Sequence, residues 1–145
     1  MNQKKNEQNI EILTVNSWDE EEIVNLYKSA GWWKDSYKSE GIKDLIRGSF
    51  LFVVAFDKIE KKAVGMGRLI SDKVSDAYIQ DLVVLDKYRK KGIGSKILNK
   101  LVKYCKDKGI IWIGLIAEPD QDFFYLSNNF AVMKKYVPMK YKEGE

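Results

Sequence analysis

The sequence predicts an α/β domain, and three stretches of the chain carry that prediction. A short β-branched run at 82–85 leads through a loop with two glycines into an amphipathic helix that ends at Gly109. Before this unit, residues 50–85 contain three strand-like segments separated by turns. After it, residues 110–117 form a nearly unbroken apolar run, which is typical of a strand covered on both faces.

Length and composition fit one domain of ordinary size. With 145 residues the chain can bury a continuous core, and we expect a single domain over residues 1–145. Because the chain has one cysteine, an internal disulfide is excluded. This residue, Cys105, falls on the apolar face of the central helix, where it is expected to pack as a small buried side chain. The sequence has no histidine, which excludes Ser-His-Asp and Cys-His catalysis and imidazole metal sites. Any acid or base must be a carboxylate, tyrosine, lysine, backbone group or water.

Charge and hydropathy indicate neither a membrane nor a nucleic-acid partner. The polar N-terminus predicts no signal peptide or anchor, and no apolar run approaches the roughly 20 residues of a membrane span. We therefore expect a cytoplasmic protein without membrane contact. The net charge of +4 arises from 25 basic and 21 acidic residues. Lys96, Lys100 and Lys103 on the central helix favour a solvated face over a nucleic-acid surface, because no aromatic-basic stacking motif accompanies them.

The first third of the chain predicts one strand and two helices. Residues 10–15 alternate weakly and favour an edge-like strand. Ser17, with Glu20 three residues later, predicts the N-cap of a helix that ends at Gly31. A loop with three aromatic side chains follows, and then a short helix around 42–46; the aromatics either cover the core or border a binding pocket. They are Trp32, Trp33 and Tyr37.

The remaining segments alternate between strands and helices. Three consecutive strands are predicted at 50–56, 63–71 and 76–85. Gly65 and Gly67 in the middle strand permit a bulge or a close backbone contact. The central helix is apolar along one face, formed by Ile93, Ile97, Leu101, Tyr104 and Cys105. After the strand at 110–117 we expect a short helix at about 120–128 and strand segments at 131–136 and 137–141.

The loop before the central helix has the features of an anion site. Its sequence is Arg89-Lys90-Lys91-Gly92-Ile93-Gly94. The first turn of a helix has N–H groups without partners and carries the positive end of the helix dipole. The two glycines remove side chains that would keep a phosphate away from those groups, and the three basic residues add positive charge. These features describe a pyrophosphate cradle.

Two common phosphate-binding motifs do not fit this loop. A dinucleotide fingerprint needs a third glycine at position 97, which is Ile97, and a Walker loop needs Gly-Lys followed by Ser or Thr. The order here is Gly94, Ser95, Lys96. The remaining pattern, Arg-x-x-Gly-x-Gly between a strand and a helix, resembles the acetyl-CoA loop of the GCN5-related N-acetyltransferase (GNAT) family.

Other segments extend this resemblance. Residues 84–89 look like the family's strand ending, and residues 124–130 are similar to its Phe-Tyr-x-x-x-Gly-Phe segment, with Asn129 in place of the glycine. Asn is the commonest non-glycine residue in the left-handed conformation, so this departure is mild. The order of elements matches the family along essentially the whole chain. The resemblance implies an α/β fold with a mixed, mostly antiparallel sheet flanked by helices and splayed centrally to hold acetyl-CoA.

The resemblance also implies which residues bind the two substrates. Backbone groups of Leu82, Val83 and Val84 would hydrogen-bond the pantetheine arm of acetyl-CoA. The pyrophosphate would be held by Arg89, Lys90, Lys91, Gly92, Ile93, Gly94 and Ser95. In this family the region between the first helices borders the acceptor pocket, which places Trp32, Trp33 and Tyr37 there. An aromatic lining suits an apolar or cationic amine, since a cation can lie on a ring face.

Tyr125 occupies the position of the family's frequent tyrosine acid. A tyrosine has an ordinary pKa of about 10, so it can stay protonated and give its hydrogen to a departing thiolate. The base is open: Asp81 and Glu118 are the carboxylates nearest the expected cleft, and we slightly favour Asp81 acting through water. Either carboxylate could equally be a structural hydrogen-bond acceptor.

The predicted function is direct transfer of the acetyl group from acetyl-CoA to a primary amine, without a metal. The acceptor is expected to be a small molecule, and family members often form homodimers. Two alternatives stay open. One is a non-catalytic acyl-CoA-binding or regulatory module that keeps the cradle, and the weaker one is a small basic nucleic-acid-binding domain, whose affinity would fall steeply with salt.

Overall fold

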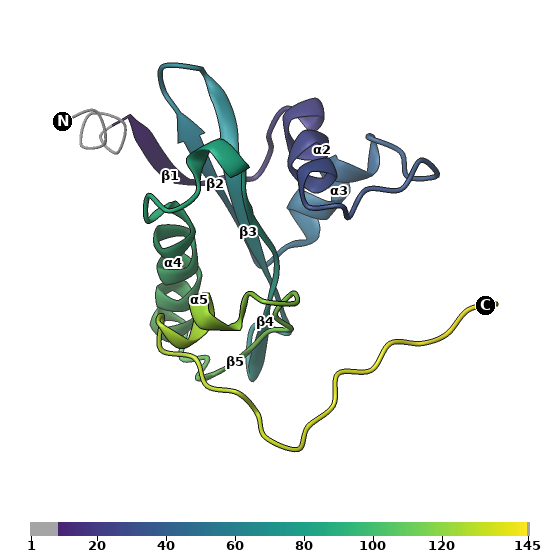
Figure 1. Ribbon diagram of the computed structural model, residues 1–145, viewed down its shortest axis with the longest axis vertical. Helices are drawn as coiled ribbons and strands as arrows, with labels where there is room; N and C mark the ends of the chain where they lie inside the picture. Colours follow the sequence, from purple (N-terminus) through teal and green to yellow (C-terminus); the bar gives the residue numbers. More distant parts are fainter. Residues whose placement is uncertain (1–8, 145) are drawn as a thin grey trace. The chain divides into compact units, whose positions relative to one another are not determined.

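The computed structural model describes residues 9–144 and contains a five-stranded mixed sheet (Figure 1). The strands lie side by side in chain order: β1 (Ile10–Thr14), β2 (Leu51–Asp57), β3 (Lys62–Ser71), β4 (Asp76–Val84) and β5 (Trp112–Gly114). The first four pair antiparallel, and β5 pairs parallel with β4. The predicted α/β class and mostly antiparallel sheet are therefore confirmed, with β1 at the expected edge.

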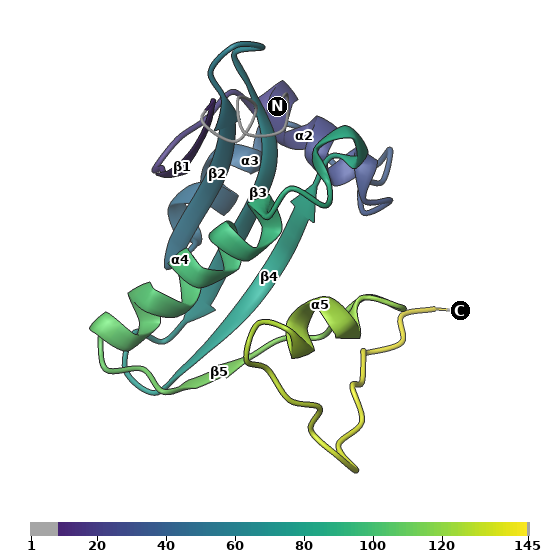
Figure 2. The ribbon, with the colours of Figure 1, turned by 60° about the vertical axis from the view of Figure 1, so that its left-hand side comes forward.

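Helices cover both faces of this sheet (Figures 1 and 2). On one face, α2 (Glu20–Ser29) and α3 (Gly41–Gly48) share an apolar cluster with side chains of β2, β3 and β4. On the other face lies α4 (Ile93–Asp107), whose buried side chains include Ile97, Leu101 and Cys105. Burial raises the pKa of the Cys105 thiol, which agrees with a packing role for this residue.

The helix α2 begins two residues later than the sequence predicts. Ser17 is not its N-cap; Asp19 is, and its Oδ1 accepts the N–H of Glu22 at 3.0 Å. Both residue types cap helices well, but an aspartate also places a negative charge at the positive end of the helix dipole. The predicted end is confirmed, because Gly31 follows the helix with a left-handed φ of +77°.

Two glycines of β3 allow α4 to pack closely on the sheet. A Cβ atom at Gly67 would lie 2.9 Å from Cγ2 of Ile97 and 3.0 Å from Cδ1 of Leu82. At Gly65 it would lie 3.1 Å from the Val83 carbonyl oxygen and 3.2 Å from Cδ1 of Ile97. Side chains at these positions would push the helix and β4 away from β3, so the predicted close approach is confirmed.

The chain divides into two compact units, Met1–Gly114 and Leu115–Glu145, and each is described by itself. The second unit contains the helix α5 (Asp122–Leu126), shorter than the predicted 120–128. Asn129 has a φ of +73°, so its left-handed conformation agrees with the sequence analysis. The single domain expected over 1–145 stays a prediction.

Three predicted strand assignments are wrong in whole or in part. The strand expected at 110–117 is limited to β5, and the segments at 131–136 and 137–141 form no strand. Apolar residues of these last segments, such as Val132, Val137 and Met139, are exposed. An apolar run becomes a strand only where a neighbouring strand takes up its backbone hydrogen bonds, and none does so for these segments in the described structure.

Two features are absent from the described residues: a helix that could cross a membrane and a cluster of metal ligands. Among residues 9–144, none of the helices is both long enough and apolar enough to cross a membrane. Over the same range, no group of three or more His, Cys, Asp or Glu side chains could hold a metal ion.

Candidate active site

The basic glycine loop lies between β4 and α4, after the short 3-10 helix η1 (Asp86–Tyr88). Gly92 is the N-cap of α4 and has a φ of +80°, and Lys90 also lies in the left-handed region with a φ of +62°. A Cβ atom at Gly92 would have no other atom within 4 Å, so the space beside it is open. No described side chain caps α4, and its first turn contains no acidic residue. The first N–H groups of α4 therefore lack side-chain acceptors, which suits an anionic ligand.

Cationic side chains surround this helix start. Arg89 and Lys90 are exposed, and Lys91 is half-buried. The Nε of Arg89 donates to the Val84 carbonyl oxygen at 3.1 Å and pairs with the Asp86 carboxylate at 3.3 Å. The Lys91 ammonium lies 5.6 Å from the centre of the Tyr88 ring. Open space, N–H groups without side-chain acceptors and positive charge thus fit the pyrophosphate of a coenzyme A thioester.

The strand β4 has a free edge beside this loop. It pairs with β5 only through Asp76, Ala77 and Tyr78, so from Ile79 to Val84 no described strand lies on that side. Leu82, Val83 and Val84, the residues expected to bind the pantetheine arm, belong to this unpaired part. The edge therefore offers backbone N–H and C=O groups to an extended ligand, in the way that a sheet edge receives another strand.

A β-bulge interrupts β4 at the start of this edge. One residue, Gly67, lies between Met66 and Arg68 of β3, whereas two residues lie between their partners Val83 and Gln80. The extra residue is in β4, and Asp81 has a left-handed φ of +58°. Aspartate tolerates this conformation better than most residues do. The bulge directs the Asp81 side chain toward the face covered by α2, where Tyr27 meets it.

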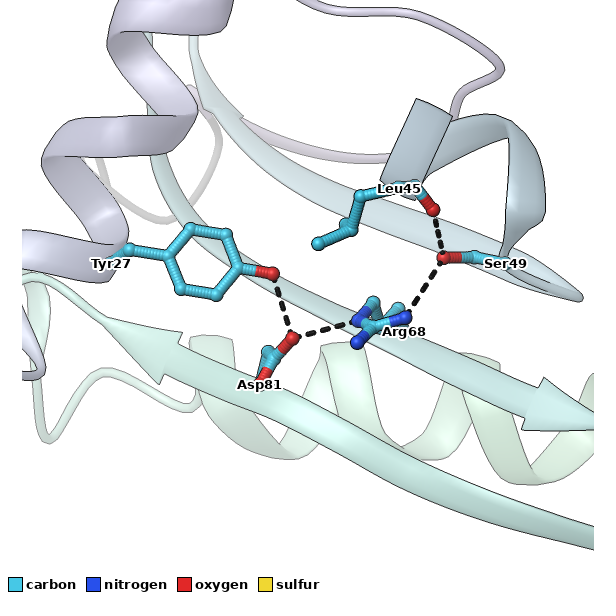
Figure 3. A network of polar contacts seen from close by, with 5 residues as sticks. All are labelled: Tyr27, Leu45, Ser49, Arg68 and Asp81. Atoms are coloured by element: carbon cyan, nitrogen blue, oxygen red, sulfur yellow. Dashed lines mark hydrogen bonds and ion pairs between the residues drawn. The ribbon is translucent and has the colours of Figure 1, made fainter. Parts of the chain in front are cut away.

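The Asp81 carboxylate is held by a hydrogen-bond network (Figure 3). Its Oδ2 accepts the hydroxyl of Tyr27 and the Nε–H of Arg68, both at 2.7 Å. Nη1 of Arg68 lies 3.5 Å from Oγ of Ser49, which itself donates to the Leu45 carbonyl at 2.7 Å. Burial, and then the charge of Asp81, raises the pKa of Tyr27, so its hydroxyl stays a donor. The Asp81 carboxylate is thus held in place by two donors on its Oδ2.

The aromatic loop lies beside this network. The ring of Trp33 has its centre 6.3 Å from that of Tyr27 and 5.5 Å from that of Tyr37, and the Trp32 ring is also 6.3 Å from Tyr27. Tyr37 is exposed, and the Lys34 ammonium lies 6.0 Å from the centre of its ring. The three predicted acceptor residues and Asp81 are therefore linked through Tyr27.

Glu118 and Tyr125 belong to the second unit. The Tyr125 ring contacts those of Phe124 and Phe130, with centres 5.0 and 5.9 Å away. Burial, and then the charge of Glu118, raises the pKa of Tyr125. The Tyr125 hydroxyl consequently stays protonated at neutral pH, as a proton donor must.

Several residues of the site were not found by sequence reasoning. The sequence analysis gives Tyr27, Arg68 and Ser49 no role in the site. Tyr27 and Asp81 are 54 positions apart, so no local motif joins them. The only available signals were a polar atom on a buried aromatic and an arginine within an otherwise apolar strand.

The fold and the loop agree with one known class of protein, the acetyltransferase (GNAT) family. The acetyltransferase (GNAT) family model matches residues 12–124. The chain belongs to this family, whose members generally use acetyl-CoA as the acetyl donor. The resemblance drawn from the Arg-x-x-Gly-x-Gly loop is thereby confirmed.

Individual relatives agree with this assignment. The uncharacterized N-acetyltransferase ycf52 of Pyropia yezoensis is 30% identical over 111 residues, covering 75% of this chain and 63% of that protein. The chain thus spans less than two thirds of that relative's length. SA2161 of meticillin-resistant Staphylococcus aureus has the same fold, with a TM-score of 0.78, 22% identity, and 93% and 99% of the two chains covered. The GNAT family acetyltransferase SP0256 of Streptococcus pneumoniae TIGR4 is similar with a TM-score of 0.77 and 26% identity, covering 94% of this chain and 99% of that chain.

Proposed function

We propose that this chain transfers the acetyl group of acetyl-CoA directly to a primary amine of a small-molecule acceptor. The observation that carries the proposal is the start of α4, which has no side-chain cap and open space at Gly92, beside the unpaired edge of β4. The uncapped helix start suits a pyrophosphate. The unpaired strand edge suits a pantetheine arm, which has two amide groups. Loop residues 89–95 and strand residues 82–84 are the proposed donor site.

The chemistry assigns separate tasks to the chain's residues. When bound, acetyl-CoA supplies a thioester carbonyl and a thiolate leaving group. As the new C–N bond forms and the C–S bond breaks, the surplus proton of the amine passes to a carboxylate or to water. The thiolate takes a proton from a tyrosine. No covalent bond to the protein is needed.

Tyr125 is the proposed acid. Burial, and then the charge of Glu118, raises its pKa and so keeps its hydroxyl protonated. We expect Tyr125→Phe to keep its affinity for acetyl-CoA and to lose turnover, because only the hydroxyl is removed. Unchanged turnover would exclude Tyr125 from the acid role.

Asp81 is the proposed base, with Glu118 as the alternative. Tyr27 and Arg68 both donate to Oδ2 of Asp81, and no described residue donates to Oδ1, so that oxygen keeps a lone pair for a water. The side chain is 20% exposed, which leaves it within reach of solvent. Asp81→Asn should shift the pH–rate profile toward higher pH, because the amine must then lose its proton without a general base. If the profile stays the same, Glu118 or bulk solvent must take the proton.

The proposed acceptor is a small amine. Trp33 and Tyr37 form an aromatic cluster with Tyr27, and the Lys34 ammonium already lies over the Tyr37 ring. A ring face that receives one ammonium group can receive that of a substrate. Replacing Tyr37 by leucine should raise the KM for a cationic acceptor and leave the KM for acetyl-CoA unchanged.

Calorimetry with acetyl-CoA tests the donor site. Wild-type protein should bind, and Gly94→Trp, which adds a bulky side chain to the first turn of α4, should not. Gly48→Trp is the matched control, because Gly48 ends α3 in open space and the same bulk there should leave binding intact. Loss of binding in both variants would point to a general folding defect, and wild-type protein that does not bind would refute the proposal.

The same experiment separates the alternative functions. Binding of acetyl-CoA without release of free coenzyme A thiol in the presence of any amine tested would indicate a non-catalytic acyl-CoA-binding module. Salt-sensitive binding to nucleic acid without affinity for acetyl-CoA would indicate the basic domain. A homodimer and a cytoplasmic location stay predictions from the sequence analysis.

A further inference from the structure

A second, partly buried hydrogen bond joins the glycine loop to a distant hairpin. The hydroxyl of Tyr88 donates to Oδ2 of Asp57 at 2.6 Å, across 31 positions of sequence. Asp57 is the last residue of β2, and Tyr88 is the last residue of η1, directly before Arg89 of the basic loop. The bond therefore ties the entrance of the proposed pyrophosphate site to the β2–β3 hairpin.

Asp57 is an unusual residue to find at this point. Among the described residues it is the one charged residue that is buried, with 7% of its surface exposed. Its Oδ1 accepts the N–H groups of Ile59 at 2.9 Å and Glu60 at 3.2 Å, which shape the hairpin turn. An asparagine could make that turn equally well and would avoid burying a charge. Compared with asparagine, the carboxylate adds a second oxygen, and this oxygen accepts the hydrogen bond from Tyr88.

Tyr88 passes this restraint on to the loop. Its backbone N–H donates to the Leu85 carbonyl at 2.8 Å, and its ring lies under the Lys91 ammonium. The backbone, the ring and the hydroxyl of Tyr88 thus each make a contact of their own. Burial, and then the hydrogen bond to Asp57, raises the pKa of Tyr88 to about 12, so its hydroxyl stays a donor at neutral pH.

We propose that Tyr88 and Asp57 are positioning residues that hold the glycine loop and Lys91 in the geometry that binds the pyrophosphate of the acetyl donor. This inference rests on the proposed use of acetyl-CoA. Fixing the loop before the ligand arrives reduces the entropy lost on binding, because fewer conformations must be given up. The restraint affects only the pyrophosphate end of the donor, since the pantetheine arm lies against β4.

The test compares two thioesters. Acetyl-CoA contains the pyrophosphate, and S-acetyl-pantetheine lacks it, so calorimetry with both separates the loop from the strand. Tyr88→Phe removes one oxygen and keeps the ring under Lys91. We expect its Kd for acetyl-CoA to rise about tenfold, the effect of one lost hydrogen bond of ordinary strength, and its Kd for S-acetyl-pantetheine to stay unchanged. Asp57→Asn, which keeps the hairpin turn, should give the same pattern.

Tyr104→Phe is the matched control. It removes the same oxygen from a tyrosine near the far end of α4, where the ring contacts Phe50, and it should change neither Kd. Equal changes of Kd for both thioesters in Tyr88→Phe would indicate a general structural effect and overturn the inference. Unchanged binding of both would overturn it as well. If wild-type protein does not bind acetyl-CoA, the proposed function fails, and that result is distinct from either of these.

Discussion

Gly67→Ala tests how closely α4 is packed against the bulged part of the sheet. The added methyl would meet Cγ2 of Ile97 at 2.9 Å, Cδ1 of Leu82 at 3.0 Å and Cδ1 of Leu101 at 3.2 Å. Overpacking of this kind costs about 1–3 kcal/mol, whereas the loss of glycine's freedom in the unfolded chain returns about 0.4–1 kcal/mol. All three contacts are ends of side chains, which can move slightly. We therefore expect a net loss of about 1–2 kcal/mol.

Urea unfolding with two spectroscopic probes measures this change and shows whether unfolding is two-state. Gly48→Ala is the control, because that glycine has open space around it at the end of α3. It should gain up to about 1 kcal/mol from helix propensity. Gly67→Ala should also bind acetyl-CoA more weakly, since Leu82 must shift. A Gly67→Ala protein as stable as wild type would refute the packing argument.

Three other substitutions test single contacts. Burial alone would raise the pKa of Asp57, but hydrogen bonds from Tyr88, Glu60 and Ile59 lower it overall. The ionised Asp57 therefore stabilises the fold fully above the ordinary aspartate pKa, and this stabilisation is lost as the pH falls through the lower pKa of the folded state. In Asp57→Asn the free energy of unfolding should consequently fall less steeply below about pH 4. Tyr27→Phe removes a bond to the Asp81 carboxylate and should cost about 1–2 kcal/mol in urea unfolding; no loss would mean that Arg68 alone holds Asp81. Asn129→Ala should cost about 1 kcal/mol because alanine resists the left-handed conformation, and Asn129→Gly should melt close to wild type, whereas equal melting of both would contradict that reasoning.

The sequence was most informative where a rule is local. The apolar spacing of α4 and the glycines at its two ends predicted a helix that the structure places at Ile93–Asp107, with Gly92 and Gly109 left-handed. The uncapped helix start could be predicted in the same way, since the orphan N–H groups of a helix start follow from backbone geometry alone. A strong period combined with a glycine signal therefore sufficed for this helix, and the donor site at its start stays a proposal.

Pairings between distant segments were beyond the sequence. Nothing near Asp57 indicates Tyr88, and nothing near Tyr27 indicates the bulge at Asp81, because each pair forms only when separate strands and helices assemble. The strands expected at 131–136 and 137–141 failed for a related reason: residue type favours an extended chain, but only a partner makes it a strand. The N-cap was predicted at Ser17 and lies at Asp19, because two residues that cap helices well are only two positions apart.

The free edge of β4 has a consequence for handling the protein. An unpaired strand edge invites pairing with a second chain, and so promotes aggregation. The bulge at Asp81 bends this edge and interrupts its regular spacing, which is one of the ways in which natural sheets discourage such pairing. The proposed binding of coenzyme A along this edge predicts that protein stored or crystallised with it stays dispersed longer than the ligand-free protein, and that amide hydrogen exchange at 82–84 slows when the ligand is added.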